Sequence, residues 1–244
     1  MRTAKTLITT ALIALTSTVF AQEAPLADPG MMITLKKMYP ATTFKEVNRT
    51  TVPGIFEVVM GQNIAYVDQT GRYFFFGRLF DMQNQQDLTA AKLDDANKIE
   101  IGQLPLADAI KTVKGNGLRV MYVFSDPDCP YCKQLEQNLV GLTDVTIYTF
   151  LFPIEGLHPQ AKGKAVAIWC SKDREGAWSS LMQKGIAPQA QNCTNPVDRN
   201  IALAQRLGIN GTPTLIAADG RKLPGAASAE RIAQWLDAGK GAAQ

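Results

Sequence analysis

This chain of 244 residues has no long hydrophobic run and only one histidine. Neither positive nor negative charge is in large excess. The longest apolar stretch, residues 7–20, has about 14 residues, whereas a membrane-spanning helix needs roughly 20. The 25 basic and 22 acidic side chains nearly balance, which argues against nucleic acid or an anionic membrane surface as a partner. The sequence contains no internal repeat and no low-complexity segment.

The short apolar stretch has the features of an export signal, residues 1–21. Arg2 and Lys5 precede it, and Val19-Phe20-Ala21 supplies small residues at the positions that a signal peptidase reads. We expect cleavage before Gln22, which leaves 23 basic and 22 acidic residues. A membrane anchor would need a longer run, and a lipid anchor would need a cysteine at the new N-terminus. The mature protein is therefore expected to be soluble and exported.

Residues 22–80 predict a small α+β domain. Asp28 followed by Pro29 is typical of a helix start, and this helix should end at Tyr39-Pro40. Strand-like runs follow at residues 44–49, 55–60, 64–67 and 72–76, with a hairpin turn at 68–71. A domain of about 60 residues is marginally stable without help from a partner or from cross-links, and this one lacks cysteine. We therefore expect it to form a dimer.

Residues 81–104 predict a polar helical linker, and residues 105–244 a catalytic α/β domain. In the linker, Thr89 could begin a charged helix that runs to about Lys98. A second helix is expected over 106–114. Strands are then expected at 120–124, 144–152 and 214–217, and helices at 130–140, 159–184, 197–207 and 229–236.

Cysteine is absent from the first 128 residues, and the first two cysteines form the motif Cys-Pro-Tyr-Cys at residues 129–132. The motif lies where a buried strand gives way to a helix. There the unpaired N–H groups of Tyr131 and Cys132 should stabilise a thiolate on Cys129. Pro130 suits the first helical position, and Cys132 lies one turn away, within reach of Cys129. Such a pair can attack a disulfide with one sulfur and release the mixed disulfide with the other.

The alternative for this motif is half of a zinc site. Zinc favours four ligands in two close pairs, but Cys170 and Cys193 are 23 positions apart and His158 is the only histidine. We therefore favour redox chemistry with neither metal nor bound cofactor. Cys170 and Cys193 are expected to form a structural disulfide, and the alternative is a second redox pair.

Several other residues could act near the motif. His158 lies in a loop, where a lone histidine is more often a surface residue. Asp126, three residues before Cys129, could handle protons, but we favour a solvated carboxylate. Trp169 is expected to pack, and the aromatic run 73–76 is expected to be core or dimer interface.

At these positions the chain resembles the periplasmic disulfide isomerases of the DsbC/DsbG family, over essentially the whole mature length. The specific parts are residues 52–59, 124–133, 168–173 and 211–213. Pro-Tyr between the cysteines is as in DsbG, whereas the additional pair Cys170 and Cys193 is as in DsbC. Threonine before the proline, at Thr212, also resembles the isomerases.

The resemblance implies a thioredoxin-like α/β catalytic domain with a helical insertion, preceded by a small dimerisation domain and a helical linker. Cys129 would be the nucleophile and Cys132 the resolving cysteine. Thr212 and Pro213 would form a cis peptide loop that contacts substrate, with Pro130 and Tyr131 also contacting it. The family is periplasmic and forms V-shaped homodimers around an uncharged cleft.

The function expected is isomerisation or reduction of incorrect disulfides in misfolded secreted proteins. A DsbD-like membrane reductase would restore the dithiol, as in the family that the chain resembles. Two alternatives stay open: reduction of sulfenylated cysteines by the same nucleophile, and a dimeric chaperone without thiol chemistry.

Overall fold

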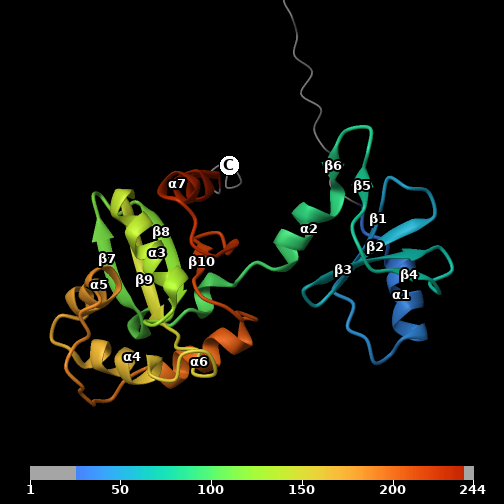
Figure 1. The fold of residues 1–244 in the computed structure, drawn as a ribbon. Helices are drawn as coiled ribbons and strands as arrows, with labels where there is room; N and C mark the ends of the chain where they lie inside the picture. Colours follow the sequence, from blue (N-terminus) through green and yellow to red (C-terminus); the bar gives the residue numbers. More distant parts are fainter. Residues whose placement is uncertain (1–25, 239–244) are drawn as a thin grey trace, which may run out of the picture. The chain divides into compact units, whose positions relative to one another are not determined.

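The computed structural model describes residues 26–238, which form two compact units (Figure 1). The first unit comprises the described residues up to 60 together with 65–76, and the second comprises 61–64 and the residues from 77 onward. The expected export signal, 1–21, lies outside the described residues. Within the described part of the chain, no helix combines the length and the apolar character needed to cross a membrane.

In the first unit a single helix packs on a four-stranded sheet. The helix α1 (Pro29–Met38) begins as expected, because the Asp28 carboxylate accepts a hydrogen bond of 2.9 Å from the Met31 N–H. The sheet has the order β1-β2-β3-β4, with bounds Glu46–Arg49, Ile55–Met60, Asn63–Asp68 and Phe74–Phe75. The predicted hairpin is confirmed, since β3 and β4 pair antiparallel.

The core of this unit is small. Among the described residues its cluster of buried side chains consists of Met31, Leu35, Phe44, Val47, Val58 and Val67. The aromatic run 73–76 contributes little to it. Phe74 is partly buried against the cluster, whereas Tyr73, Phe75 and Phe76 are exposed. The expectation that this run is core is therefore wrong for three of its four residues, and the interface alternative remains.

The second unit begins with a short hairpin and the linker helix. Strands β5 (Phe80–Asp81) and β6 (Gln86–Asp87) pair antiparallel and lead into α2 (Leu88–Ala96). Asp87, rather than Thr89, caps this helix, and its carboxylate accepts the N–H groups of Thr89 and Ala90. Beyond α2, the Ile99 N–H donates to the Gly220 carbonyl at 2.9 Å. This bond fixes the end of the linker to the turn before β11.

The helix expected over residues 106–114 is not present. The chain instead forms two short 3₁₀ turns, Ile101–Gln103 and Leu106–Asp108, and then the strand β7 (Ile110–Lys114). Ile110 is buried, and Lys111 and Val113 are exposed, so these residues alternate with the period of a strand. β7 pairs antiparallel with β9 and closes one edge of the sheet.

A five-stranded sheet of order β11-β10-β8-β9-β7 forms the centre of the second unit. The remaining strands are β8 (Arg119–Ser125), β9 (Val145–Leu151), β10 (Thr214–Ala217) and β11 (Lys222–Pro224). β8 and β9 are parallel, and β10 runs antiparallel to both β8 and β11. β11, an edge strand, was not expected from the sequence.

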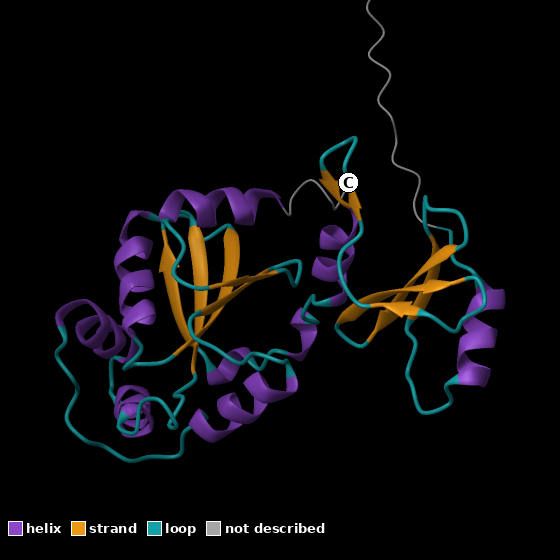
Figure 2. Ribbon diagram, turned by 45° about the vertical axis from the view of Figure 1, so that its right-hand side comes forward, coloured by secondary structure: helices purple, strands orange, loops and turns teal. Residues whose placement is uncertain are grey.

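Helices pack on both faces of this sheet (Figure 2), because successive side chains of β8 point to opposite faces and are buried on both. Met121 and Val123 pack with α3 (Pro130–Asn138), its 3₁₀ extension (Leu139–Gly141) and α7 (Ala229–Ala238). Tyr122 and Phe124 pack with α6 (Val197–Arg206). A further cluster joins α4 (Ala161–Cys170) and α5 (Arg174–Lys184) to the start of α3. The two helices replace the single helical stretch expected over 159–184.

Candidate active site

The two cysteines of the motif lie where β8 ends and α3 begins. Cys129 is the residue that precedes the helix, with extended backbone angles (φ −67°, ψ 123°), and Pro130 occupies the first helical position as expected. Both cysteines are free thiols in the structure, and both are buried. Tyr131 between them is 64% exposed. The site therefore presents the middle of the motif to solvent and keeps its sulfur atoms covered.

A loop far along the chain covers the nucleophile candidate. The Cys129 thiol donates a hydrogen bond to the carbonyl of Thr212, with a sulfur–oxygen distance of 3.4 Å. The Thr212–Pro213 peptide bond is cis, which confirms the prediction. The contact follows from the sheet, because Thr214 of β10 pairs with Phe124 of β8. That register places the cis peptide opposite the end of β8, where the motif starts.

The hydrogen bonds expected for a Cys129 thiolate are not made by the thiol that the structure contains. The Cys129 side chain accepts no hydrogen bond from the first turn of α3, so the bonds expected from the N–H groups of Tyr131 and Cys132 are not made. The thiol instead donates to the Thr212 carbonyl, and the expectation for the thiolate stays a prediction.

The second cysteine is the more deeply buried of the two. Cys132 is fully buried in the cluster formed by α3, α4 and α5, and burial raises the pKa of its thiol to about 12. The Asp126 N–H donates to its sulfur at 3.4 Å, which offsets the burial only in part. Cys132 is therefore a thiol, not a thiolate, throughout the physiological pH range.

Asp126, expected to be a solvated carboxylate, is fully buried instead. Its carboxylate accepts the N–H groups of Asp128 and Ile154, each at 2.7 Å, and lies 3.0 Å from His158 Nδ1. The loop that follows β9 folds over Asp126 and supplies two of these partners. His158 is 22% exposed and belongs to the site, contrary to the expectation of a surface residue. No local pattern in the sequence indicated that this loop covers the motif.

An ion pair completes the surroundings of the motif. Lys164 Nζ of α4 lies 2.5 Å from a carboxylate oxygen of Asp128, the residue before Cys129. The Cys129 N–H donates to the Asp126 carbonyl at 3.2 Å. The loop before Cys129 is thus held by α4 and by the loop after β9.

The other two cysteines are joined to each other. Cys170 and Cys193 form a disulfide with a Cα–Cα distance of 5.8 Å, which confirms the predicted pairing. The bond closes a segment that contains α5. Trp169 beside it is buried as expected, with the Arg174 guanidinium 3.8 Å from its ring centre. Its packing role is thereby supported.

Two family models match the chain. The model for thioredoxin-like domains matches residues 106–240, and the model for the N-terminal domain of disulfide bond isomerase proteins matches 17–90. The thiol:disulfide interchange protein DsbC of Haemophilus influenzae is 30% identical over 183 residues, which cover 73% of this chain and 77% of that protein. The chain belongs to the DsbC family.

Other relatives agree with this assignment. The probable thiol:disulfide interchange protein DsbC of Bordetella pertussis is 38% identical over 73% of the chain, and the chain covers 63% of that protein's length. Among solved structures, a disulfide interchange protein from Neisseria gonorrhoeae is 44% identical with a TM-score of 0.54. That match covers 55% of this chain and 97% of the solved one.

The burial of Cys132 predicts how it titrates. In a Cys129→Ser variant, far-ultraviolet absorbance should detect no thiolate until the pH exceeds roughly 10, because the pKa of the buried thiol lies at about 12. When the same variant is unfolded in denaturant, the pKa of the Cys132 thiol should return to roughly 8.5, the pKa of a free cysteine. A transition near that free value in the folded variant would show that Cys132 is accessible to water.

The disulfide predicts a loss of stability when it is removed. The double variant Cys170→Ser, Cys193→Ser should lower the free energy of unfolding by about 3 kcal/mol, because the unfolded chain regains the freedom of the closed loop. Denaturant unfolding measures this change. Thiol exchange at Cys129 should persist in the folded variant, and its loss would instead favour a second redox pair.

Proposed function

We propose that this protein is an exported thiol–disulfide isomerase of the periplasm that acts on incorrect disulfides in secreted proteins. The observation that carries the proposal is the free dithiol at Cys129 and Cys132, with the first thiol bonded to the cis Thr212–Pro213 loop. Membership of the DsbC family supports it. Export is inferred from the features of residues 1–21.

In the first step the Cys129 thiolate attacks one sulfur of a client disulfide. The client S–S bond breaks, a Cys129–client disulfide forms, and the second client sulfur leaves as a thiolate. The exposed Tyr131 and Pro130 and the cis loop lie around Cys129, whose sulfur makes the attack, and we assign them to client binding. Before the attack the Thr212 carbonyl accepts a hydrogen bond from the Cys129 thiol. After the attack the same carbonyl can accept a hydrogen bond from a backbone N–H of the client.

The mixed disulfide can then be resolved in two ways. If another client thiolate attacks the client sulfur, Cys129 leaves as a thiolate and the client has been isomerised without net oxidation. If Cys132 attacks Cys129, the enzyme keeps the disulfide and the client receives two electrons. The second route needs an ionised Cys132, and burial raises the pKa of that thiol to about 12. The environment of Cys132 therefore favours isomerisation over reduction.

The reductive route leaves an oxidised enzyme, so a supply of electrons is required. We assign this role to a membrane reductase of the DsbD type that donates two electrons and two protons to the Cys129–Cys132 disulfide. The proposal needs no bound cofactor and no metal, because both redox groups belong to the polypeptide.

The central assay is the refolding of a scrambled protein with several disulfides. The wild-type protein should accelerate recovery of native pairing, and Cys129→Ser should abolish this because the free thiol that remains, Cys132, is fully buried and its pKa is raised to about 12. Cys132→Ser should retain partial isomerisation and accumulate mixed disulfides. The double variant Cys129→Ser, Cys132→Ser is the control: if it still promotes recovery of activity, the protein acts as a chaperone instead.

We further propose that the mature protein is a homodimer formed through residues 22–80. The small core of the first unit and its exposed Phe75 and Phe76 support an interface there. Sedimentation at micromolar concentration should show a dimer. Phe75→Asp combined with Phe76→Asp should give a monomer, because two carboxylates would have to be buried.

A matched control is Leu157→Asp, which alters an exposed apolar residue of the second unit. This variant should sediment as a dimer. A wild-type monomer, or equal dissociation by Leu157→Asp, would contradict the proposed interface.

A further inference from the structure

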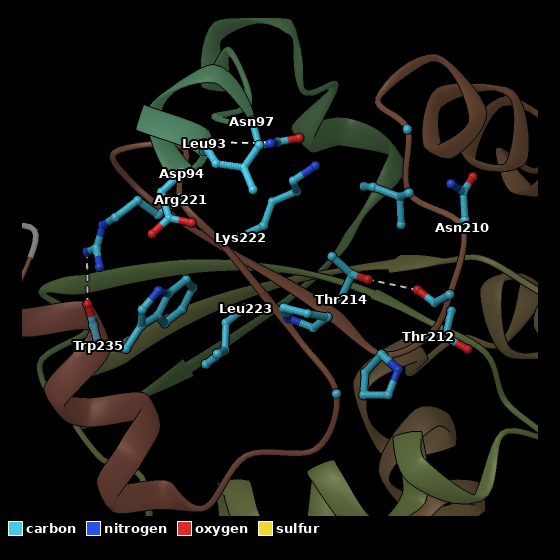
Figure 3. Close-up of a pocket in the computed structure, with 16 residues that line it drawn as sticks. Leu93, Asp94, Asn97, Asn210, Thr212, Thr214, Arg221, Lys222, Leu223 and Trp235 are labelled. Carbon is cyan, nitrogen blue, oxygen red and sulfur yellow. Dashed lines mark hydrogen bonds between the residues drawn. The ribbon is translucent and has the colours of Figure 1, made fainter. Parts of the chain in front are cut away.

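A cavity of about 650 Å³ opens beside the cis peptide loop (Figure 3). All of its walls belong to the second unit. One wall is α2, another is the loop 208–214, and the floor is the edge of the sheet at 221–225 together with Trp235. Thr212 lines the cavity, and its carbonyl accepts the Cys129 thiol. A polypeptide joined to Cys129 therefore lies next to this cavity.

The floor of the cavity carries an unpaired strand edge. The Ala217 N–H donates to the Arg221 carbonyl and the Gly225 N–H to the Pro213 carbonyl, so these positions of the β10–β11 ladder face β10. In an antiparallel ladder the bonding positions alternate, and Lys222, opposite Ile216, must direct its N–H and carbonyl away from β10. β11 is the outermost strand of its sheet, so these two groups are available to another strand.

The same residue provides a charge without a partner. Lys222 forms no salt bridge among the described residues, and burial lowers the pKa of its ammonium group. Its neighbour Arg221 is already occupied by Asp219 at 2.6 Å and by the Trp235 carbonyl. Asp94 lines the cavity from α2, but it is not within ion-pair distance of Lys222. In Figure 3 the Lys222 side chain extends from the strand toward α2, beneath Asn97.

Apolar side chains complete the lining. Leu93 from α2, Leu223 from β11 and Trp235 from α7 provide surfaces that can cover side chains of an extended segment. A free strand edge with apolar neighbours suits binding by strand addition, in which main-chain bonds supply affinity and side-chain contacts supply selectivity. The unpaired ammonium adds a preference for negative charge.

We propose that this cavity binds the client segment next to the attacked cysteine, as an added strand on β11, and that Lys222 selects segments carrying Asp or Glu. The inference rests on the proposed function, because the segment is presented through Cys129. It adds a class of preferred client, in which an acidic side chain lies within a few residues of the mispaired cysteine.

The test uses the full mature protein carrying Cys132→Ser, so that mixed disulfides accumulate. The probes are two ten-residue peptides, each with one cysteine activated as a 2-thiopyridyl disulfide. The two peptides differ only at the third and fourth positions on both sides of that cysteine. One peptide has Glu at these positions, and the other has Lys. Thiopyridone release gives the rate for each.

The Glu peptide should react about three- to fivefold faster than the Lys peptide, the effect expected of a partly exposed ion pair. Lys222→Met should make the two rates equal, and Lys222→Glu should reverse their order. The matched control, Lys184→Glu, makes the same change of net charge at an exposed position outside the cavity and should keep the wild-type ratio. If the two peptides react at equal rates in every variant, the inference is overturned and the proposed function is left intact. If neither peptide reacts, the result counts against the proposed function itself.

Strand addition has its own signature. In the isolated Glu-peptide complex, hydrogen exchange of the Lys222 amide should slow by at least about tenfold relative to the free protein. An unchanged rate would overturn the added strand. Protection that rises with protein concentration in the absence of peptide would also overturn it, since the occupant of the edge would then be a second copy of the chain.

Discussion

The antiparallel pairing of β10 with β8 is the interaction on which the site depends. It joins segments about 90 residues apart in the chain, with Thr214 opposite Phe124 and Ala217 opposite Met121. One end of this ladder presents the motif, and the same end presents the cis Thr212–Pro213 peptide. Neither segment alone brings the cis peptide next to a thiol. The arrangement of the candidate site is therefore a property of strand register, and a slip by one residue would remove the cis peptide from Cys129.

The two thiols of the motif differ because the two sides of α3 differ. Cys129 precedes the helix and faces the cis loop, while Cys132 lies one turn later and points into the packed interior. Burial penalises a negative charge on Cys132, which raises the pKa of its thiol. The buried Asp126 reinforces this arrangement by fixing the loop that leads into the motif.

Much of the fold could be predicted because it depends on local signals. The strand–motif–helix junction, the cap at Asp28 and the hairpin at 68–71 are all encoded within a few residues. Asp87 in place of Thr89 as the cap of α2 is a local signal that was misread, whereas the larger failures come from tertiary packing that no local pattern reports. Residues 110–114 form a strand because β9 offers an edge, and Asp126 is buried because the distant loop around Ile154 and His158 folds over it. The lysine at the free edge of β11 could not be singled out before that strand was known.

The Cys170–Cys193 disulfide has a chemical consequence apart from its contribution to stability. Cys170 packs against the same apolar cluster that contains Cys129 and Cys132. Four free cysteines could pair in three ways, and two of those pairings would consume the redox cysteines. Locking Cys170 to Cys193 removes a competing sulfur from the apolar cluster that contains Cys129 and Cys132. The bond thus keeps Cys170 and Cys193 from pairing with Cys129 or Cys132.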